Sequence, residues 1–136
     1  MNLEIVPGPT KEQLAELHRG LRDYNSEFVP NEFIPVKAVV TGRSDHVIAG
    51  IDGTAHWGKV HVSILWVDAG HRGKGLGGRL MGWAEEQGRA IGCHAVVVDT
   101  LSFQAPGFYR RLGYTQFGET RDYEGGHSRL YFEKAI

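Results

Sequence analysis

The sequence predicts a single α/β domain built on a mixed sheet of about six or seven strands. Three observations predict this fold class. The N-terminal part has the apolar spacing of an amphipathic helix. Several strand-like segments with short links follow it, as in antiparallel pairing. Near the middle, a strand, a helix and a continuous apolar run succeed one another, an order typical of a parallel βαβ unit.

The size and composition of the chain exclude some classes of function and partner. Its 136 residues, taken as one domain over residues 1–136, are enough to bury a core without metals or disulfides. A formal net charge of -1 removes the usual electrostatic reason to expect a nucleic-acid partner. No apolar leader or membrane-length apolar run is present, and the single cysteine, Cys93, has no internal partner. We expect a cytoplasmic protein that binds neither membrane nor nucleic acid.

The N-terminal segment predicts a short strand and then a helix. Residues 3–6 (LEIV) are a strand candidate, which Pro7-Gly8-Pro9 ends. Thr10 is a good N-cap for a helix over residues 10–28. The apolar residues of that helix recur every three or four positions, which predicts one apolar face: Leu14, Leu17, Leu21, Tyr24 and Phe28.

The next segments predict antiparallel strands. Residues 29–35 contain two prolines and indicate a loop, and strands are expected over residues 36–42, 46–57 and 60–68. The last of these changes its pattern halfway, because every residue from Ile64 to Val67 is apolar. Either both faces of the strand are buried there, or the strand contains a bulge.

The rest of the chain predicts the parallel unit and a final pair of strands. A helix is expected over residues 75–92, with Gly92 as its stop, and a buried central strand over residues 93–100. A short helix over residues 107–113 and strands over residues 114–119 and 128–134 close the fold. Gly125-Gly126 marks the turn between the two strands.

Four glycines and three basic residues lie in HRGKGLGGRL, residues 71–80, directly after a predicted strand. A P-loop is excluded because Lys74 is followed by glycine and not by serine or threonine. Gly73, Gly75 and Gly78 match the dinucleotide fingerprint, with Asp99 near the expected distance. That interpretation needs a large parallel sheet, for which too little chain follows Asp99. A third interpretation is an anion site at a helix N-terminus, where glycines let backbone N–H groups approach a pyrophosphate.

Three segments appear together in this order: LWVDAGHRGKGLGGRLMGWAE, GCHAVVVDT and SFQAPGFYRRLGY. The first contains Arg72-x-x-Gly75-x-Gly77, which fits the motif R/Q-x-x-G-x-G/A. In these features the sequence resembles the GNAT superfamily of acetyl-CoA-dependent N-acetyltransferases. The resemblance implies a mixed, mostly antiparallel sheet with a central parallel βαβ splay, flanked by about four helices. It also implies that the bulged strand separates from its parallel neighbour and that pantetheine lies in the gap.

The resemblance assigns roles to residues along the cofactor. It implies that backbone groups of Leu65, Trp66 and Val67 meet pantetheine. The loop that wraps the pyrophosphate comprises Arg72, Gly73, Lys74, Gly75, Leu76 and Gly77. Ser102 replaces the family's asparagine, and Ala105 keeps its place. Tyr109 is the expected general acid for the departing thiolate, although a tyrosine packed under the sheet, with its hydroxyl bonded to backbone, fits the sequence too.

The acceptor side is less defined by the sequence. Its general base is not identifiable, and Glu32, Asp68, Asp122 and His127 are candidates that also fit ordinary solvated loops. The histidines show no i,i+4 pair, so no metal is expected. We expect transfer to a primary amine of a small molecule, while a peptide or protein amine stays open. A homodimer is possible. Two alternatives are a non-catalytic acyl-CoA-binding module and a nicotinamide-dependent oxidoreductase.

Overall fold

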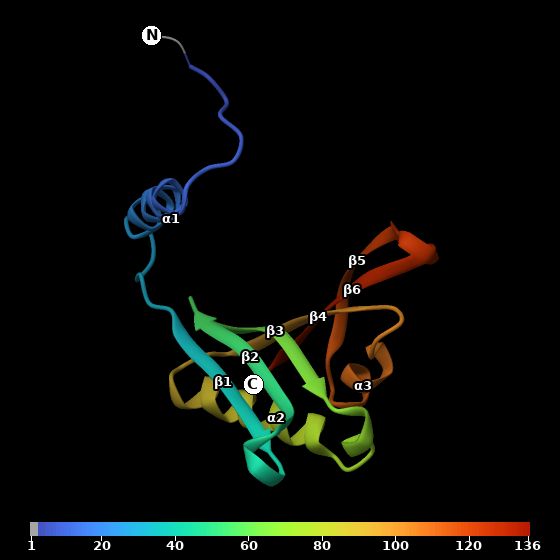
Figure 1. Cartoon of the computed structure of the whole chain (residues 1–136). Helices are drawn as coiled ribbons and strands as arrows, with labels where there is room; N and C mark the ends of the chain where they lie inside the picture. Colours follow the sequence, from blue (N-terminus) through green and yellow to red (C-terminus); the bar gives the residue numbers. More distant parts are fainter. Residues whose placement is uncertain (1–2) are drawn as a thin grey trace. The chain divides into compact units, whose positions relative to one another are not determined.

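The computed structural model describes residues 3–136, which divide into two compact units: the residues up to Glu32 and Phe33–Ile136 (Figure 1). None of the helices in this described range combines the length and apolarity needed to cross a membrane.

The N-terminal unit contains one helix, α1, over Lys11–Asn25. The predicted N-cap is confirmed, since Thr10 accepts a hydrogen bond from the Gln13 backbone N–H and the Gln13 side chain accepts one from the Thr10 N–H. The helix ends three residues before the predicted Phe28, at the Ser26 cap. Its apolar face is exposed. The strand predicted over residues 3–6 is wrong, because that segment is extended and exposed with no neighbouring strand to pair with.

The larger unit is built on one six-stranded sheet with the order β1-β2-β3-β4-β6-β5. All neighbouring strands are antiparallel except β3 and β4. This confirms the predicted mixed sheet with one central parallel pair, and the described residues form three α-helices. The strands are β1 Ile34–Thr41, β2 Val47–His56, β3 Lys59–Val67, β4 Ala95–Leu101, β5 Thr115–Tyr123 and β6 His127–Ala135.

Strand β1 begins two residues earlier than predicted and includes Pro35, which the sequence placed in a loop. Proline lacks a backbone N–H and is tolerated on an edge strand. Because β1 is at the edge of the sheet and pairs with β2 alone, Pro35 lies opposite Thr54 without breaking the ladder.

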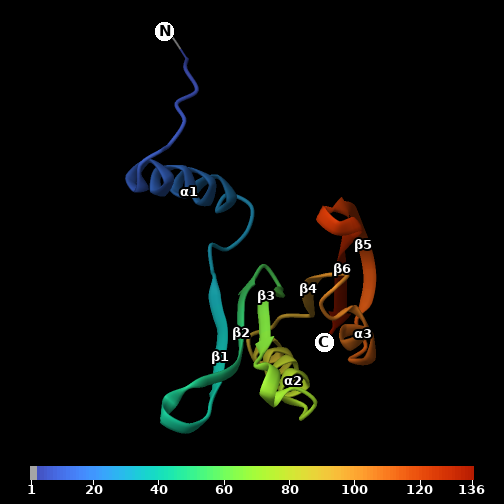
Figure 2. The same cartoon turned by 45° about the vertical axis from the view of Figure 1, so that its right-hand side comes forward.

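The predicted bulge in β3 is confirmed and lies at Ser63. Asp52 of β2 pairs with Ile64 and Gly53 pairs with Val62, so Ser63 is the extra residue between them. On its other side, β3 pairs with β4 only from Lys59–Ala95 to Val62–Val98. The two parallel strands therefore separate at the bulge. In Figure 2, β1 and β2 lie on one side of this gap, and β5, β6 and α3 lie on the other.

Helix α2, Leu76–Ala90, crosses one face of β1 to β4 (Figure 1). Leu80, Met81 and Ala84 point into the core, where they meet Val60 and Phe132 among other buried side chains. Gly88 permits close packing of the helix, since a Cβ there would lie 2.8 Å from Val60 Cγ2. The short helix α3, Pro106–Arg111, completes the described helices.

A buried carboxylate joins α2 to the C-terminal strands. Glu85 is 6% exposed and accepts hydrogen bonds from the Tyr114 hydroxyl at 3.0 Å and the Lys134 ammonium at 2.9 Å. Burial and the Glu85 charge raise the pKa of Tyr114 well above its ordinary value, which keeps the phenol a donor. The compensated charge fixes the position of α2 relative to β6.

The packing of Gly88 predicts opposite effects of two alanine substitutions in one helix. Gly88→Ala forces a methyl group against the stiff side chain of Val60, so we expect a loss of about 1–3 kcal/mol in the free energy of unfolding. Gly82→Ala is the matched control: a Cβ there has no neighbour within 4 Å, so the substitution should be neutral or stabilising by up to about 1 kcal/mol. Urea denaturation measures both, and equal effects would contradict the packing argument.

Candidate active site

A cavity of about 940 Å³ lies in the gap between β3 and β4. One wall is the end of β3, from Ser63 to Val67, and the other is the end of β4, from Val98 to Leu101. Beyond the Val62–Val98 pair, neither strand has a sheet partner on the side that faces the gap. Peptide groups without a ladder partner seek other hydrogen bonds, so both walls suit an extended ligand that carries amides.

The glycine-rich loop closes one end of the cavity. Gly73 and Gly75 adopt left-handed backbone angles, with φ of 78° and 80°, which other residues rarely adopt. Gly75 is the N-cap of α2 and provides no side-chain cap, so the first N–H groups of the helix stay available for an anion. Arg72 stabilises the loop by donating from Nε to the Val67 carbonyl at 3.0 Å.

Gly77 lets α2 approach α3 closely. A Cβ on Gly77 would lie 3.1 Å from the Phe108 ring, so a side chain at this position would press α3 away. Phe108 and its neighbours Ala105 and Tyr109 line the cavity. The glycine at this position therefore sets the width of the cavity between the loop and α3.

Tyr109 is 5% exposed and contacts the cavity from α3. Burial, with a smaller contribution from the negative charge of Asp99, raises the pKa of Tyr109 to about 12. No other described residue forms a hydrogen bond with its hydroxyl, so the phenol is not bonded to backbone as the alternative interpretation expected. Tyr109 is thus a protonated donor with an available O–H at neutral pH.

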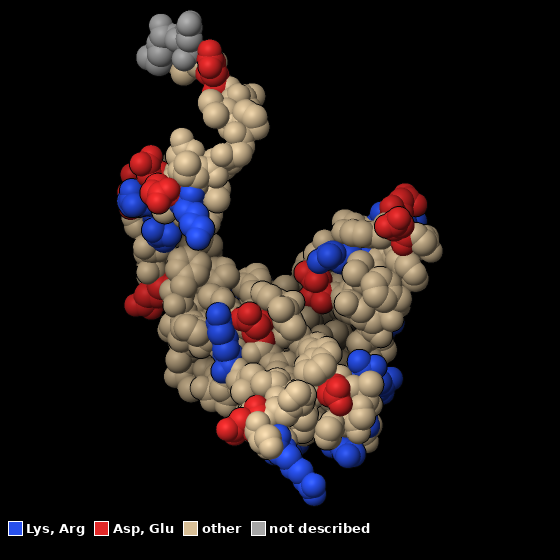
Figure 3. Space-filling view, in the orientation of Figure 1, with Lys and Arg blue, Asp and Glu red and all other residues tan. Residues whose placement is uncertain are grey.

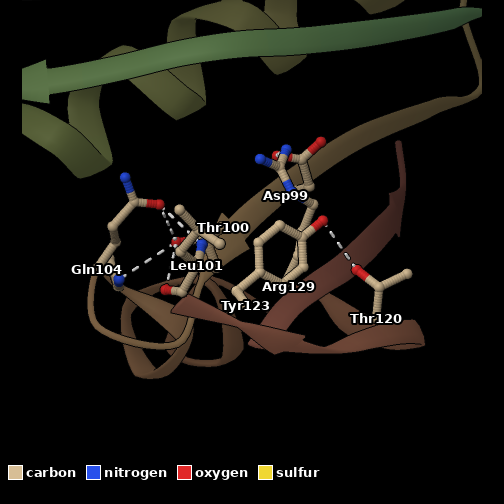
Figure 4. A network of polar contacts seen from close by, with 8 residues as sticks. Asp99, Thr100, Leu101, Gln104, Thr120, Tyr123 and Arg129 are labelled. Carbon is tan, nitrogen blue, oxygen red and sulfur yellow. Dashed lines mark hydrogen bonds and ion pairs between the residues drawn. The ribbon is translucent and has the colours of Figure 1, made fainter. Parts of the chain in front are cut away.

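A side-chain network holds the segment between β4 and α3 (Figure 4). The amide oxygen of Gln104 accepts hydrogen bonds from the Leu101 N–H at 2.7 Å and the Thr100 hydroxyl at 3.3 Å. The Thr100 hydroxyl in turn accepts from the Ala105 N–H at 3.3 Å. These contacts replace the missing cap of α3 and fix the start of the helix that carries Tyr109.

A charged pair forms another part of the wall. Arg129 of β6 lies 3.1 Å from the Asp99 carboxylate of β4, and both residues line the cavity (Figure 4). The Arg129 guanidinium also lies over the Tyr123 ring, 5.6 Å from its centroid. The Tyr123 hydroxyl accepts a hydrogen bond from Thr120 at 3.2 Å. The pair is therefore supported from β5 as well as from β4.

The structure brings most of the predicted cofactor residues to one cavity. The predicted residues that line it are Leu65, Trp66, Val67, Arg72, Gly73, Gly75, Leu76, Gly77, Ala105 and Tyr109. Lys74 belongs to the same loop but is not among the lining residues. Ser102 lies outside the lining as well, and its hydroxyl accepts from the Ser128 N–H at 3.0 Å and contacts His127 Nδ1 at 3.2 Å.

The predicted acceptor residues are dispersed. Asp68 caps a turn by accepting from the Gly70 N–H and lies 3.1 Å from the His71 ring, and these hydrogen bonds lower the pKa of Asp68. His127 contacts Ser102, and Asp122 is an exposed β5 residue with a φ of 63°. Glu32 belongs to the N-terminal unit. None of the four is among the residues that line the cavity.

Seven polar lining residues were missed as site residues: Ser63, His71, Asp99, Thr100, Gln104, Arg111 and Arg129. Asp99 was considered only as a ribose partner in the dinucleotide interpretation. Arg129 reaches the site because it pairs in register with Leu101, a long-range relation that no local pattern signals. The one available sequence signal was Asp99 itself, an aspartate that directly follows four apolar residues near the end of a strand, where functional side chains are common.

Figure 3 shows basic and acidic side chains interspersed on the drawn face, without one continuous basic surface. Within residues 3–136, no three His, Cys, Asp or Glu side chains gather as metal ligands would.

Comparisons with known proteins agree with the fold. Residues 4–114 match the model of the acetyltransferase (GNAT) family. The chain is 45% identical over 86 residues to the blasticidin-S acetyltransferase of Streptomyces morookaense, a match that covers 62% of this chain and 63% of that protein, less than two thirds of its length.

Two solved structures are similar as well. A crystal structure of an acetyltransferase from Bacillus cereus ATCC 14579 has a TM-score of 0.86 and 28% sequence identity, and the match covers 98% of each chain. A Bacillus anthracis protein crystallised in complex with acetyl coenzyme A shares the fold, with a TM-score of 0.68 and 16% identity over 81% of this chain and 67% of that one. Because the family match extends over most of the sequence, the chain belongs to the acetyltransferase (GNAT) family.

Proposed function

We propose that this protein transfers the acetyl group of acetyl-CoA directly to a primary amine of a small molecule. The observation that carries the proposal is one continuous cavity that joins the glycine loop, the unpaired ends of β3 and β4, and the buried Tyr109. We further propose that residues 1–136 act as one catalytic domain. The Bacillus cereus acetyltransferase supports this, because the match covers 98% of each chain.

The residues of the cavity fit the parts of acetyl-CoA. The N-terminus of α2, with Gly73 and Gly75 in left-handed conformation, suits the pyrophosphate. The backbone of β3 from Leu65 to Val67, which has no strand partner on the side of β4, suits the amides of pantetheine. When bound, acetyl-CoA supplies the activated acetyl thioester. A cavity of about 940 Å³ is at the upper end of the usual range for ligand sites, as a long ligand requires.

Tyr109 is the proposed general acid. Its pKa of about 12 lies above the ordinary value of a tyrosine, so the phenol stays protonated throughout the neutral range and has a proton to give to the leaving sulfur. Its burial limits competing hydrogen bonds from water. The Thr100–Gln104 network keeps the start of α3 in place, and α3 positions the phenol.

The acceptor is proposed to be small. The similarity to a blasticidin-S acetyltransferase supports this choice and makes blasticidin S the first acceptor to try. A peptide or protein amine is the alternative acceptor, because the fold does not determine the substrate. The cytoplasmic location and the homodimer stay predictions.

Ligand binding tests the cofactor assignment. Acetyl-CoA at about a hundredfold excess over its dissociation constant should stabilise the native state by roughly 2.7 kcal/mol. This corresponds to an increase of several degrees in Tm, measured by thermal unfolding of the full chain. NADH at the same concentration serves as the control and should produce no shift. A shift with NADH alone would restore the dinucleotide interpretation of Gly73, Gly75 and Gly78.

Substitution of Tyr109 tests the mechanism. Tyr109→Phe removes the proton donor and keeps the ring, so we expect kcat to fall about 100-fold or more, measured as thiol release, while the Tm increase with acetyl-CoA is unchanged. Tyr24→Phe, on the exposed face of α1, is a control for loss of a tyrosine hydroxyl. If Tyr109→Phe turns over as fast as the wild type, the general-acid assignment is wrong.

A further inference from the structure

Asp99 is the single carboxylate among the residues that line the cavity within the described part of the chain. The other charged lining residues are basic: Arg72, Arg111 and Arg129. An acceptor amine is mostly protonated in neutral water and enters the site as a cation. Asp99 is therefore the one side chain of the wall with a charge opposite to that of an ammonium group.

The geometry keeps Asp99 and Arg129 together and accessible. Leu101 of β4 pairs with Arg129 of β6, so Asp99, two residues before Leu101, lies diagonally opposite Arg129 on the same face. The side chains are 42% and 35% exposed, so a ligand in the cavity can reach both. One Arg129 nitrogen lies 3.1 Å from the carboxylate, and the guanidinium has further N–H donors.

The pair lines the same cavity as Tyr109, the proposed general acid. The Asp99 charge contributes to the raised pKa of Tyr109, so the carboxylate is within electrostatic reach of the phenol. The Tyr123 ring and the Thr120 hydroxyl that donates to it hold Arg129 from the other side. A ligand group bound by Asp99 would therefore lie within the cavity that Tyr109 also contacts.

The ion pair also selects among amines. A simple cation that approaches Asp99 competes with Arg129 for the same carboxylate and therefore gains little binding free energy. A molecule that carries both an ammonium and a carboxylate replaces one ion pair by two, because its carboxylate satisfies the guanidinium. Arginine is well suited to bind a carboxylate through two parallel hydrogen bonds.

We propose that Asp99 and Arg129 form the acceptor subsite, in which Asp99 binds the amine to be acetylated and Arg129 binds an anionic group of the same molecule. The substrate class is a small zwitterionic amine. This inference rests on the proposed acetyl transfer and deepens it. Asp99 and Arg129 act as specificity-determining residues. The bound ammonium first loses one proton to water, and the neutral amine then forms the N–C bond while the C–S bond of the thioester breaks. Tyr109 protonates the leaving sulfur, and the second proton of the amine returns to Tyr109.

Matched acceptors test the subsite. The full chain is assayed by thiol release with blasticidin S and with small primary amines in pairs, each pair comprising a free carboxylic acid and its methyl ester. Wild type should prefer the acid over its ester by about tenfold or more in kcat/KM. Asp99→Asn should lower kcat/KM for all acceptors by about 10- to 100-fold, mainly through KM. Arg129→Gln should remove the preference for the acid.

Controls separate this inference from the proposed function. Asp52→Asn and Lys37→Gln break a similar exposed pair, 3.5 Å apart on β1 and β2, and should leave both kinetic constants unchanged. The Tm increase with acetyl-CoA should be equal in all variants, which shows that they fold and bind the donor. If wild type acetylates amines but Asp99→Asn behaves like Asp52→Asn, or acids and esters are equivalent, the subsite is wrong. If wild type binds acetyl-CoA but acetylates no amine, the proposed function fails and the subsite with it.

Discussion

The separation of β3 and β4 after Val62 and Val98 is the constraint on which the rest of the structure depends. Parallel strands in a sheet normally satisfy each other's backbone along their full length. Here the bulge at Ser63 turns β3 away, and each strand continues with another partner, β3 with β2 and β4 with β6. The cost of unpaired peptide groups is limited because the gap is open to solvent and ligand.

The two sides of the gap have different origins. The proposed donor side is built from consecutive residues, because the bulged strand, the glycine loop and the first turn of α2 follow one another in the chain. The proposed acceptor side is assembled from β4, β5 and β6, which include residues distant in sequence. A local stretch of sequence can thus keep the donor-binding geometry while substitutions in the C-terminal hairpin change the acceptor. This division gives a physical reason why one fold serves many acceptors.

The same division explains how much the sequence could predict. Features with a local signal were predicted: the Thr10 cap, the bulge in β3 and the helix that starts at the glycine-rich loop. The strand at residues 3–6 failed because an apolar stretch forms a strand only where a partner lies beside it. The Asp99–Arg129 pair and the contact of Ser102 with Ser128 depend on the register between β4 and β6, which becomes visible only in the folded sheet.

The buried Glu85 has a consequence for how the molecule moves. Its carboxylate accepts hydrogen bonds from Tyr114, next to β5, and from Lys134 of β6. If α2 slid by one turn, a charge would be left without a partner in the core. Glu85 thereby links α2, which follows the glycine loop, to the β5–β6 hairpin, which contains Arg129. Thermal motion is expected to displace the two sides of the gap together, so the proposed donor and acceptor sites keep their alignment.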